Sequence, residues 1–414
     1  MRILKEFPPE TDLLQKHRPD TIQELHKVNN HIHTPYSYSA FKDISQIFHM
    51  AVQENIALLG INDFYTTAGY EEFYRLSLKN GVMPLFNIEF MGLVKEWQEQ
   101  DFRVNDPKNP GRVYLTGKGL SYPLIMGAKS RQQLESLKHH SEVQVRKMVD
   151  KLNAFFHDLT IPLELNFDEL KQKYVKELVR ERHVATALRE KIFEIASTQE
   201  AVIELLTNIY EGKSHQADLD DHAALENELR SNLLKKGGRA FIPEDENAFL
   251  SFEQIMEIVT DGGGIPCYPV LLDNEKGEFT DFESQWQRMS DQLISKNIGC
   301  IELIPGRNDF DILYAFVKFF HDRNFIITFG TEHNTPALKP LTVKCRDEVP
   351  LNETLKRINF EGASVIAAHQ YKMARGEEGF LSSNNKPKRE YRDDFVKLGK
   401  AVIKEFFSTC DEGM

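Results

Sequence analysis

The chain has 414 residues, enough for two to three domains or for one large α/β barrel that carries insertions. Its 63 acidic and 51 basic residues give a net charge of −12, which argues against a nucleic-acid partner because phosphate backbones require a basic surface. A hydrophobic fraction of 41% excludes disorder as the dominant state, since there is ample apolar surface to bury.

No apolar run approaches the ~20 residues that span a bilayer, and the N-terminus lacks the apolar core of a signal peptide. The four cysteines show no CxxC spacing, so we expect reduced thiols and no disulfide framework. These features predict a cytoplasmic protein without a membrane partner. They do not indicate an oligomeric state.

Seven short apolar runs predict β-strands, at 28–33, 57–62, 82–88, 112–116, 264–271, 300–304 and 325–329. Amphipathic helical patterns separate several of them, and the glycines at 262–264 are typical of a helix stop. Alternating strands and helices predict a parallel sheet covered by helices. The pattern fits an open doubly wound sheet and a closed barrel equally well.

The segment 132–238 interrupts this alternation with helical periodicity and few glycines, so we expect an inserted helical subdomain. Insertions of this size often cover a site as lids. From about 341 to 414 the pattern is helical again, which predicts a C-terminal helical extension.

The pair His31 and His33 lies in the first predicted strand, where alternate side chains face the same side. Two imidazoles so placed can bind one metal ion, although an HxH sequence also occurs by chance. Asp63, Glu89 and the pair Glu332–His333 follow the ends of three other predicted strands. Each carboxylate alone is more simply a solvated loop residue or helix cap. Together they favour a metal centre, because catalytic groups of α/β barrels gather at the carboxyl ends of the strands.

In order and spacing these segments resemble the PHP family, the polymerase and histidinol phosphatase phosphoesterases. The resemblance covers roughly residues 25–340 and includes HIHTPYS from His31, NDF from Asn62, NIE from Asn87, VYL from Val113, YP at Tyr268 and GTEHN from Gly330. The segment HVATAL from His183 is similar to one in the helical insertion of one branch. The resemblance implies a distorted seven-stranded β/α (TIM-like) barrel, split into 25–131 and 239–340 by the insertion at 132–238.

Several family ligand positions have changed. Phe64, Tyr114 and Tyr268 stand where the family has histidines, Glu332 stands for an aspartate, and Asn334 stands for the last histidine. The remaining ligand candidates are His31, His33, Asp63, Glu89 and Glu332, with His333 joining them if the loop register shifts. We therefore expect one or two divalent ions (Zn, Mn or Fe), fewer than the three of the family, next to His31 and His33.

The resemblance also implies that Asp63 and His183 act on the substrate, and Arg307, just past the sixth predicted strand, is a further candidate. Arg307 can bind a phosphate bidentately. Arg180 and Arg182 lie among glutamates, which favours a charged helix face over a substrate contact.

The first hypothesis is a metal-dependent phosphoesterase that hydrolyses a small phosphorylated metabolite by means of a metal-bound hydroxide. The alternative is a degenerate barrel that binds a ligand without catalysis. In that case Phe64, Tyr114 and Tyr268 would cluster around the two histidines as an aromatic pocket.

Overall fold

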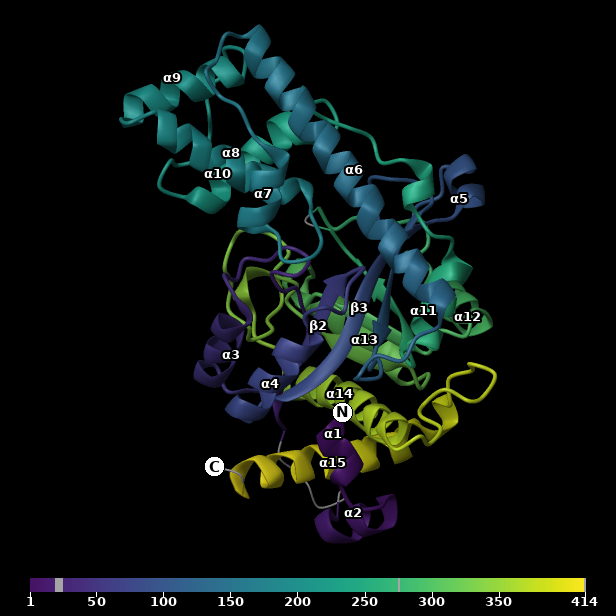
Figure 1. The fold of residues 1–414 in the computed structure, drawn as a ribbon. Coiled ribbons are helices and arrows are strands. Elements are labelled where there is room, and N and C mark those ends of the chain that lie inside the picture. The colour runs from purple at the N-terminus through teal and green to yellow at the C-terminus, as the bar shows by residue number, and fades with distance from the viewer. Residues whose placement is uncertain (19–24, 275, 413–414) are drawn as a thin grey trace.

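The computed structural model describes residues 1–18, 25–274 and 276–412. Its centre is one seven-stranded sheet, around which the helices are arranged (Figure 1). The strands pair in sequence order: β1 (Lys27–Ile32), β2 (Ile56–Phe64), β3 (Met83–Leu93), β4 (Arg112–Lys118), β5 (Ile265–Val270), β6 (Cys300–Leu303) and β7 (Ile326–Phe329). After β7, the chain returns to β1 through a parallel bridge between Ile32 and Glu332, where His33 N–H donates to the Glu332 carbonyl at 2.7 Å. The seven predicted strands and the barrel are thus confirmed.

The expectation of a fully parallel sheet is wrong at β4, which runs antiparallel to both β3 and β5. The connection 94–111 contains only the short α5 (Lys95–Glu99) and no long crossover helix, so the chain re-enters the sheet at the edge where β3 ends. The start of β4 therefore lies beside the end of β3, with Tyr114 opposite Met91. Glu89 lies inside β3, because this strand continues to Leu93.

Helices cover the barrel, and their ends follow local capping rules. Asp43 caps α3 (Ile44–Gln53), and Asp309 caps α13 (Phe310–His321). Ser251 and Gln254 form a capping box on α11 (Phe252–Asp261), which ends at the predicted glycine stop. The barrel is also covered by α4 (Tyr70–Asn80) and α12 (Trp286–Ser295).

The C-terminal helices α14 (Glu353–Ala374) and α15 (Arg392–Glu412) pack on this same barrel, together with α1 (Arg2–Glu6) and α2 (Glu10–His17) (Figure 1). Asn359 of α14 accepts a hydrogen bond from Phe329 N–H at 2.8 Å and donates to the Val28 carbonyl at 3.1 Å. Its amide therefore satisfies backbone groups of β7 and β1. The C-terminal extension is part of the barrel core.

The inserted helices lie at the other end of the barrel (Figure 1). They are α6 (Ala128–Asp158), α7 (Phe167–Tyr174), α8 (Glu181–Ile195), α9 (Gln199–Ile209) and α10 (His222–Leu229), followed by a π-helical turn at Arg230–Leu234. Leu134 and Leu137 of α6 belong to the barrel core, whereas Val145 and Leu152 belong to a second core made by the insertion. One long helix thus joins the two cores. Within the described part of the chain, no helix has the length and apolarity needed to cross a membrane.

Candidate metal centre

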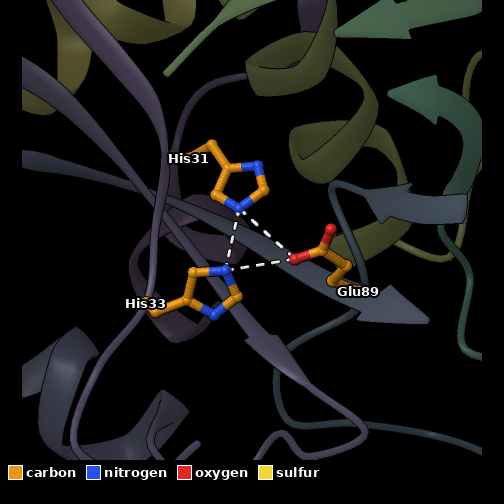
Figure 2. Close-up of side chains that lie close together, drawn as sticks. All are labelled: His31, His33 and Glu89. Atoms are coloured by element: carbon orange, nitrogen blue, oxygen red, sulfur yellow. Dashed lines mark hydrogen bonds and ion pairs between the residues drawn. The ribbon is translucent and has the colours of Figure 1, made fainter. Parts of the chain in front are cut away.

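His31, His33 and Glu89 bring three ligand atoms together inside the barrel (Figure 2). The two Nε2 atoms lie 3.1 Å apart, and Glu89 Oε2 lies 3.5 Å from His31 Nε2 and 3.1 Å from His33 Nε2. All three side chains are buried. Among the residues that the structure describes, this is the one group of three or more His, Cys, Asp or Glu side chains close enough to share an ion. We call it the His-His-Glu cluster.

The donors of the His-His-Glu cluster fit a divalent transition metal. Glu89 Oε2 is buried and accepts no hydrogen bond, an arrangement that a bound cation would satisfy. Burial disfavours the charge of Glu89, yet the two histidines outweigh this and hold the pKa of its carboxyl well below its usual range. Two imidazole nitrogens and one carboxylate oxygen suit Zn, Mn or Fe.

On the side away from the cluster, His31 contacts a pair of charged residues, Glu302 and Lys118, that the sequence analysis missed. Its Nδ1 donates to Glu302 of β6 at 2.9 Å, and Lys118 of β4 forms an ion pair with the same carboxylate. Burial alone would lower the pKa of His31, but Glu302 and Glu89 raise it to about 9. The available sequence signal was Glu302, a charged residue inside the apolar run of β6, whereas Lys118 is the last residue of β4.

Asp63, predicted as a metal ligand and catalytic residue, lies outside the His-His-Glu cluster. Its carboxylate accepts hydrogen bonds from Thr34 N–H at 2.7 Å, Thr34 Oγ1 at 2.6 Å and Ser37 Oγ at 2.6 Å. These contacts use its oxygens to fix the turn that follows His33. The structure therefore gives Asp63 a role in shaping the loop.

Glu332 and His333 are also outside the cluster. Glu332 forms an ion pair with Arg307, and both side chains line the cavity above His31. Both ring nitrogens of His333 are engaged locally, Nδ1 with Thr331 Oγ1 at 2.9 Å and Nε2 with the Lys339 carbonyl at 2.8 Å. The backbone of this loop is held against β1, since Thr331 N–H and Glu332 N–H both donate to the His31 carbonyl.

The three aromatic replacements do not form one pocket. Phe64 stacks on His33, with ring centres 4.9 Å apart and an interplanar angle of 19°, and Tyr114 lies 6.3 Å from Phe64. Tyr268 instead donates to the buried carboxylate of Glu283 at 3.1 Å. The aromatic cluster required by the binding-module alternative is therefore incomplete.

A cavity of about 310 Å³ opens above His31 and Glu89. Arg180, Arg182 and Arg230 of the insertion line it together with Arg307 of the barrel. The expectation that Arg180 and Arg182 form a solvated helix face is wrong, because both lie on this cavity and Arg180 covers the Phe64 ring.

His183 lies behind the cavity wall. Its Nδ1 accepts a hydrogen bond from Arg180 N–H at 3.0 Å, and its ring packs edge-on against Tyr38. Burial lowers the pKa of His183 to about 4, so the ring is neutral. His183 is thus the third residue of α8, and its side chain bonds back to the backbone of the N-cap residue Arg180 instead of lining the cavity.

No family model matches the chain, and no curated protein matches its sequence. Solved structures do share its fold. A protein from Bifidobacterium adolescentis, assigned as a metal-dependent phosphoesterase, superposes with a TM-score of 0.53 at 13% identity and covers 81% of this chain and 96% of its own. An amidohydrolase from Chromobacterium violaceum, solved with sulfate and no metal, gives a TM-score of 0.50 at 14% identity and covers 80% and 96%.

These similarities establish the fold alone, since both identities are low. They agree with the seven-stranded barrel and its sequential strand order. The chain thus has a seven-stranded, TIM-like barrel fold that it shares with solved structures of a metal-dependent phosphoesterase and an amidohydrolase.

Proposed function

We propose that the protein is a metal-dependent phosphoesterase that hydrolyses a small phosphorylated metabolite. The observation that carries this proposal is a single cavity with the His-His-Glu cluster at its base and four arginines around it. Phosphate esters are recognised by such guanidinium groups, and their hydrolysis is assisted by divalent cations.

His31, His33 and Glu89 would hold one divalent ion. When bound, such an ion polarises a phosphoryl oxygen and lowers the pKa of water. The proposed number of ions follows from the ligands, because the described residues offer one group of converging ligand atoms. Asp63, Glu332 and His333 instead contact other residues of the protein. One ion per chain is accordingly the proposed stoichiometry, below the three of the family that the sequence resembles.

The arginines of the cavity are the residues proposed to bind the substrate. In the described part of the chain no carboxylate forms an ion pair with Arg182, which donates to the Asn227 oxygen at 3.1 Å. Burial and the neighbouring Arg230 lower the pKa of Arg182 to about 10, a repulsion that an anionic ligand would relieve. Phosphate binding by Arg182 and Arg307 places the ester next to the His-His-Glu cluster. The cavity volume suits a small substrate better than a polymer.

The test is hydrolysis of a panel of phosphomonoesters with Mn²⁺, Zn²⁺ or Fe²⁺, by the wild-type protein and by the double variant His31→Ala, His33→Ala. We expect metal-dependent release of phosphate that the double variant loses. A matched control is His139→Ala, His140→Ala, which removes two adjacent histidines of α6 outside the cavity and leaves the activity intact.

Equal activity of wild type and the double variant at the cluster would overturn the proposal. So would hydrolysis of an amide panel without any phosphomonoester activity, which would assign the site to amidohydrolase chemistry. Elemental analysis is expected to find one divalent ion per chain in the wild type, and three ions at full occupancy would contradict the proposed centre.

A further inference from the structure

Lys118 and Glu302 form a buried ion pair directly behind His31. The two side chains come from β4 and β6 and are 0% and 1% exposed. Lys118 Nζ also faces two neutral oxygens, Asn62 Oδ1 at 3.4 Å and the Asn30 carbonyl at 3.5 Å. Burying an ion pair costs desolvation energy, so such a pair contributes little to the stability of a fold. Its position next to the metal-ligand candidate His31 therefore suggests a role at the metal site.

Glu302 contacts only one ring nitrogen of His31, whereas Asn62 Nδ2 lies 3.0 Å from both and so does not distinguish between them. One carboxylate oxygen accepts from Lys118, and the other lies 2.9 Å from His31 Nδ1. An ionised carboxylate can only accept hydrogen bonds, so Nδ1 must donate. With a proton held on Nδ1 by Glu302, Nε2 is the nitrogen that gives up its proton and offers a lone pair when an ion binds, and Nε2 faces His33 and Glu89.

We propose that Lys118 and Glu302 are positioning residues that fix His31 in the tautomer whose Nε2 binds the metal ion. Lys118 neutralises Glu302 and fixes which of its oxygens faces His31, and Glu302 orients the ring. The inference rests on the metal site of the proposed function and concerns how that site is kept ready for an ion. Groups that orient a metal-binding histidine in this way contribute about 10- to 100-fold to metal affinity.

The sharpest test is Glu302→Gln, because Lys118 can only donate. The amide oxygen of the new side chain would turn toward Lys118, and its NH₂ group would face His31 Nδ1. That nitrogen must then accept, which moves the proton to Nε2 and blocks the ligand. We expect the dissociation constant for Zn²⁺, measured by chelator competition, to rise about 10- to 100-fold.

The double variant Lys118→Met, Glu302→Gln gives the diagnostic result. Without the ammonium group the amide can rotate, so that its oxygen again accepts from His31 Nδ1–H. We expect Zn²⁺ affinity to recover about tenfold relative to Glu302→Gln alone, although two buried groups have changed. A purely structural pair would instead lose further affinity with the second substitution. In histidine-labelled, zinc-loaded protein, the ¹⁵N resonances should show the His31 proton on Nδ1 in the wild type.

The chain offers a matched control in Lys16, His17 and Glu405. There too one carboxylate contacts a lysine at 2.7 Å and a histidine at 2.6 Å, but on α2 and α15, away from the cluster. Glu405→Gln should leave Zn²⁺ affinity unchanged. Circular dichroism and thermal melting check that every variant is folded.

The inference is overturned if folded Glu302→Gln binds Zn²⁺ as tightly as wild type, or if adding Lys118→Met restores no affinity. Normal metal affinities without phosphoester hydrolysis would overturn the proposed function and leave this inference standing. Absence of Zn²⁺ binding by the wild type would overturn both.

Discussion

The guanidinium of Arg180 lies 4.5 Å from the centre of the Phe64 ring. The same ring also stacks on His33, with the two ring centres 4.9 Å apart. The helical insertion therefore touches the His-His-Glu cluster through one aromatic side chain. Because Phe64 offers no lone pair to a metal, its place beside His33 serves packing and the exclusion of water.

Replacing Arg180 by alanine should weaken substrate binding more than turnover. The substitution removes one positive charge at the cavity, and a hydrogen bond from a charged group to a bound phosphate contributes about 1.5–3 kcal/mol, so KM for a hydrolysed phosphoester should rise about 10- to 150-fold with a smaller fall in kcat. Steady-state kinetics measure this split. Arg146→Ala is the control, since Arg146 covers Phe167 at 4.1 Å within the insertion and does not line the cavity. An unchanged KM for Arg180→Ala would contradict the assignment of Arg180 to substrate binding.

Asp63→Asn should lower stability rather than metal content. An amide offers one acceptor where the carboxylate accepts from Thr34 and Ser37 with both oxygens. We expect the free energy of unfolding to fall by about 1–3 kcal/mol in urea titrations, with the ion stoichiometry unchanged. Glu89→Gln should instead lose the ion and leave the free energy of unfolding unchanged, because Glu89 Oε2 accepts no hydrogen bond in the protein. Loss of the ion in Asp63→Asn at unchanged stability would restore Asp63 as a ligand.

Gly330→Ala should displace His31. A Cβ atom at Gly330 would lie 2.2 Å from the Cβ of His31, a distance that only a shift of β1 or of the loop can relieve. Overpacking of this kind costs about 1–3 kcal/mol of stability, and the displaced imidazole should also weaken Zn²⁺ binding. Gly306→Ala is the control beside the same cavity, since its nearest neighbour would be the Lys344 carbonyl at 3.7 Å. Native Zn²⁺ affinity in Gly330→Ala would show that the cluster tolerates this shift.

The stability of the protein should fall with acid because of His369. Its Nε2 donates to the Gly263 carbonyl at 2.7 Å, and its Nδ1 accepts from Phe380 N–H at 3.0 Å, so the native ring is neutral. Burial, assisted by nearby Lys388, lowers its pKa to about 4. In the unfolded chain His369 takes up a proton below pH ~6.5, whereas in the folded chain it does so only near pH 4. The contribution of His369 to the free energy of unfolding is therefore fully present above pH ~6.5 and is lost as the pH falls from ~6.5 to 4.

The expected loss between pH 7 and pH 5 is about 2 kcal/mol for this group. Urea unfolding at both values measures it, and His369→Gln should show a correspondingly smaller difference between the two pH values. The same pH dependence in wild type and His369→Gln would exclude this origin.

The sequence by itself determined the seven strands, predicted a helical insertion and gave six ligand candidates, among which are the three members of the His-His-Glu cluster. These features are local, because strand periodicity places His31 and His33 on one face, and the apolar run before Glu89 carries that carboxylate into the sheet. The resemblance to the PHP family added the barrel, which the alternation of strands and helices had left open. Periodicity does not encode strand direction, so β4 was assigned the wrong orientation.

Only the tertiary structure decided which partner each remaining polar side chain meets. Arg307 meets Glu332, Asp63 meets the Thr34 turn, and Lys118 meets Glu302 across 184 positions of the chain. A side-chain hydrogen bond acts over about 3 Å, so its formation depends on how distant segments pack and not on the residues next to it in sequence. For the same reason Arg180 and Arg182, which have the local composition of a solvated helix face, became walls of the cavity once the insertion was placed over the barrel.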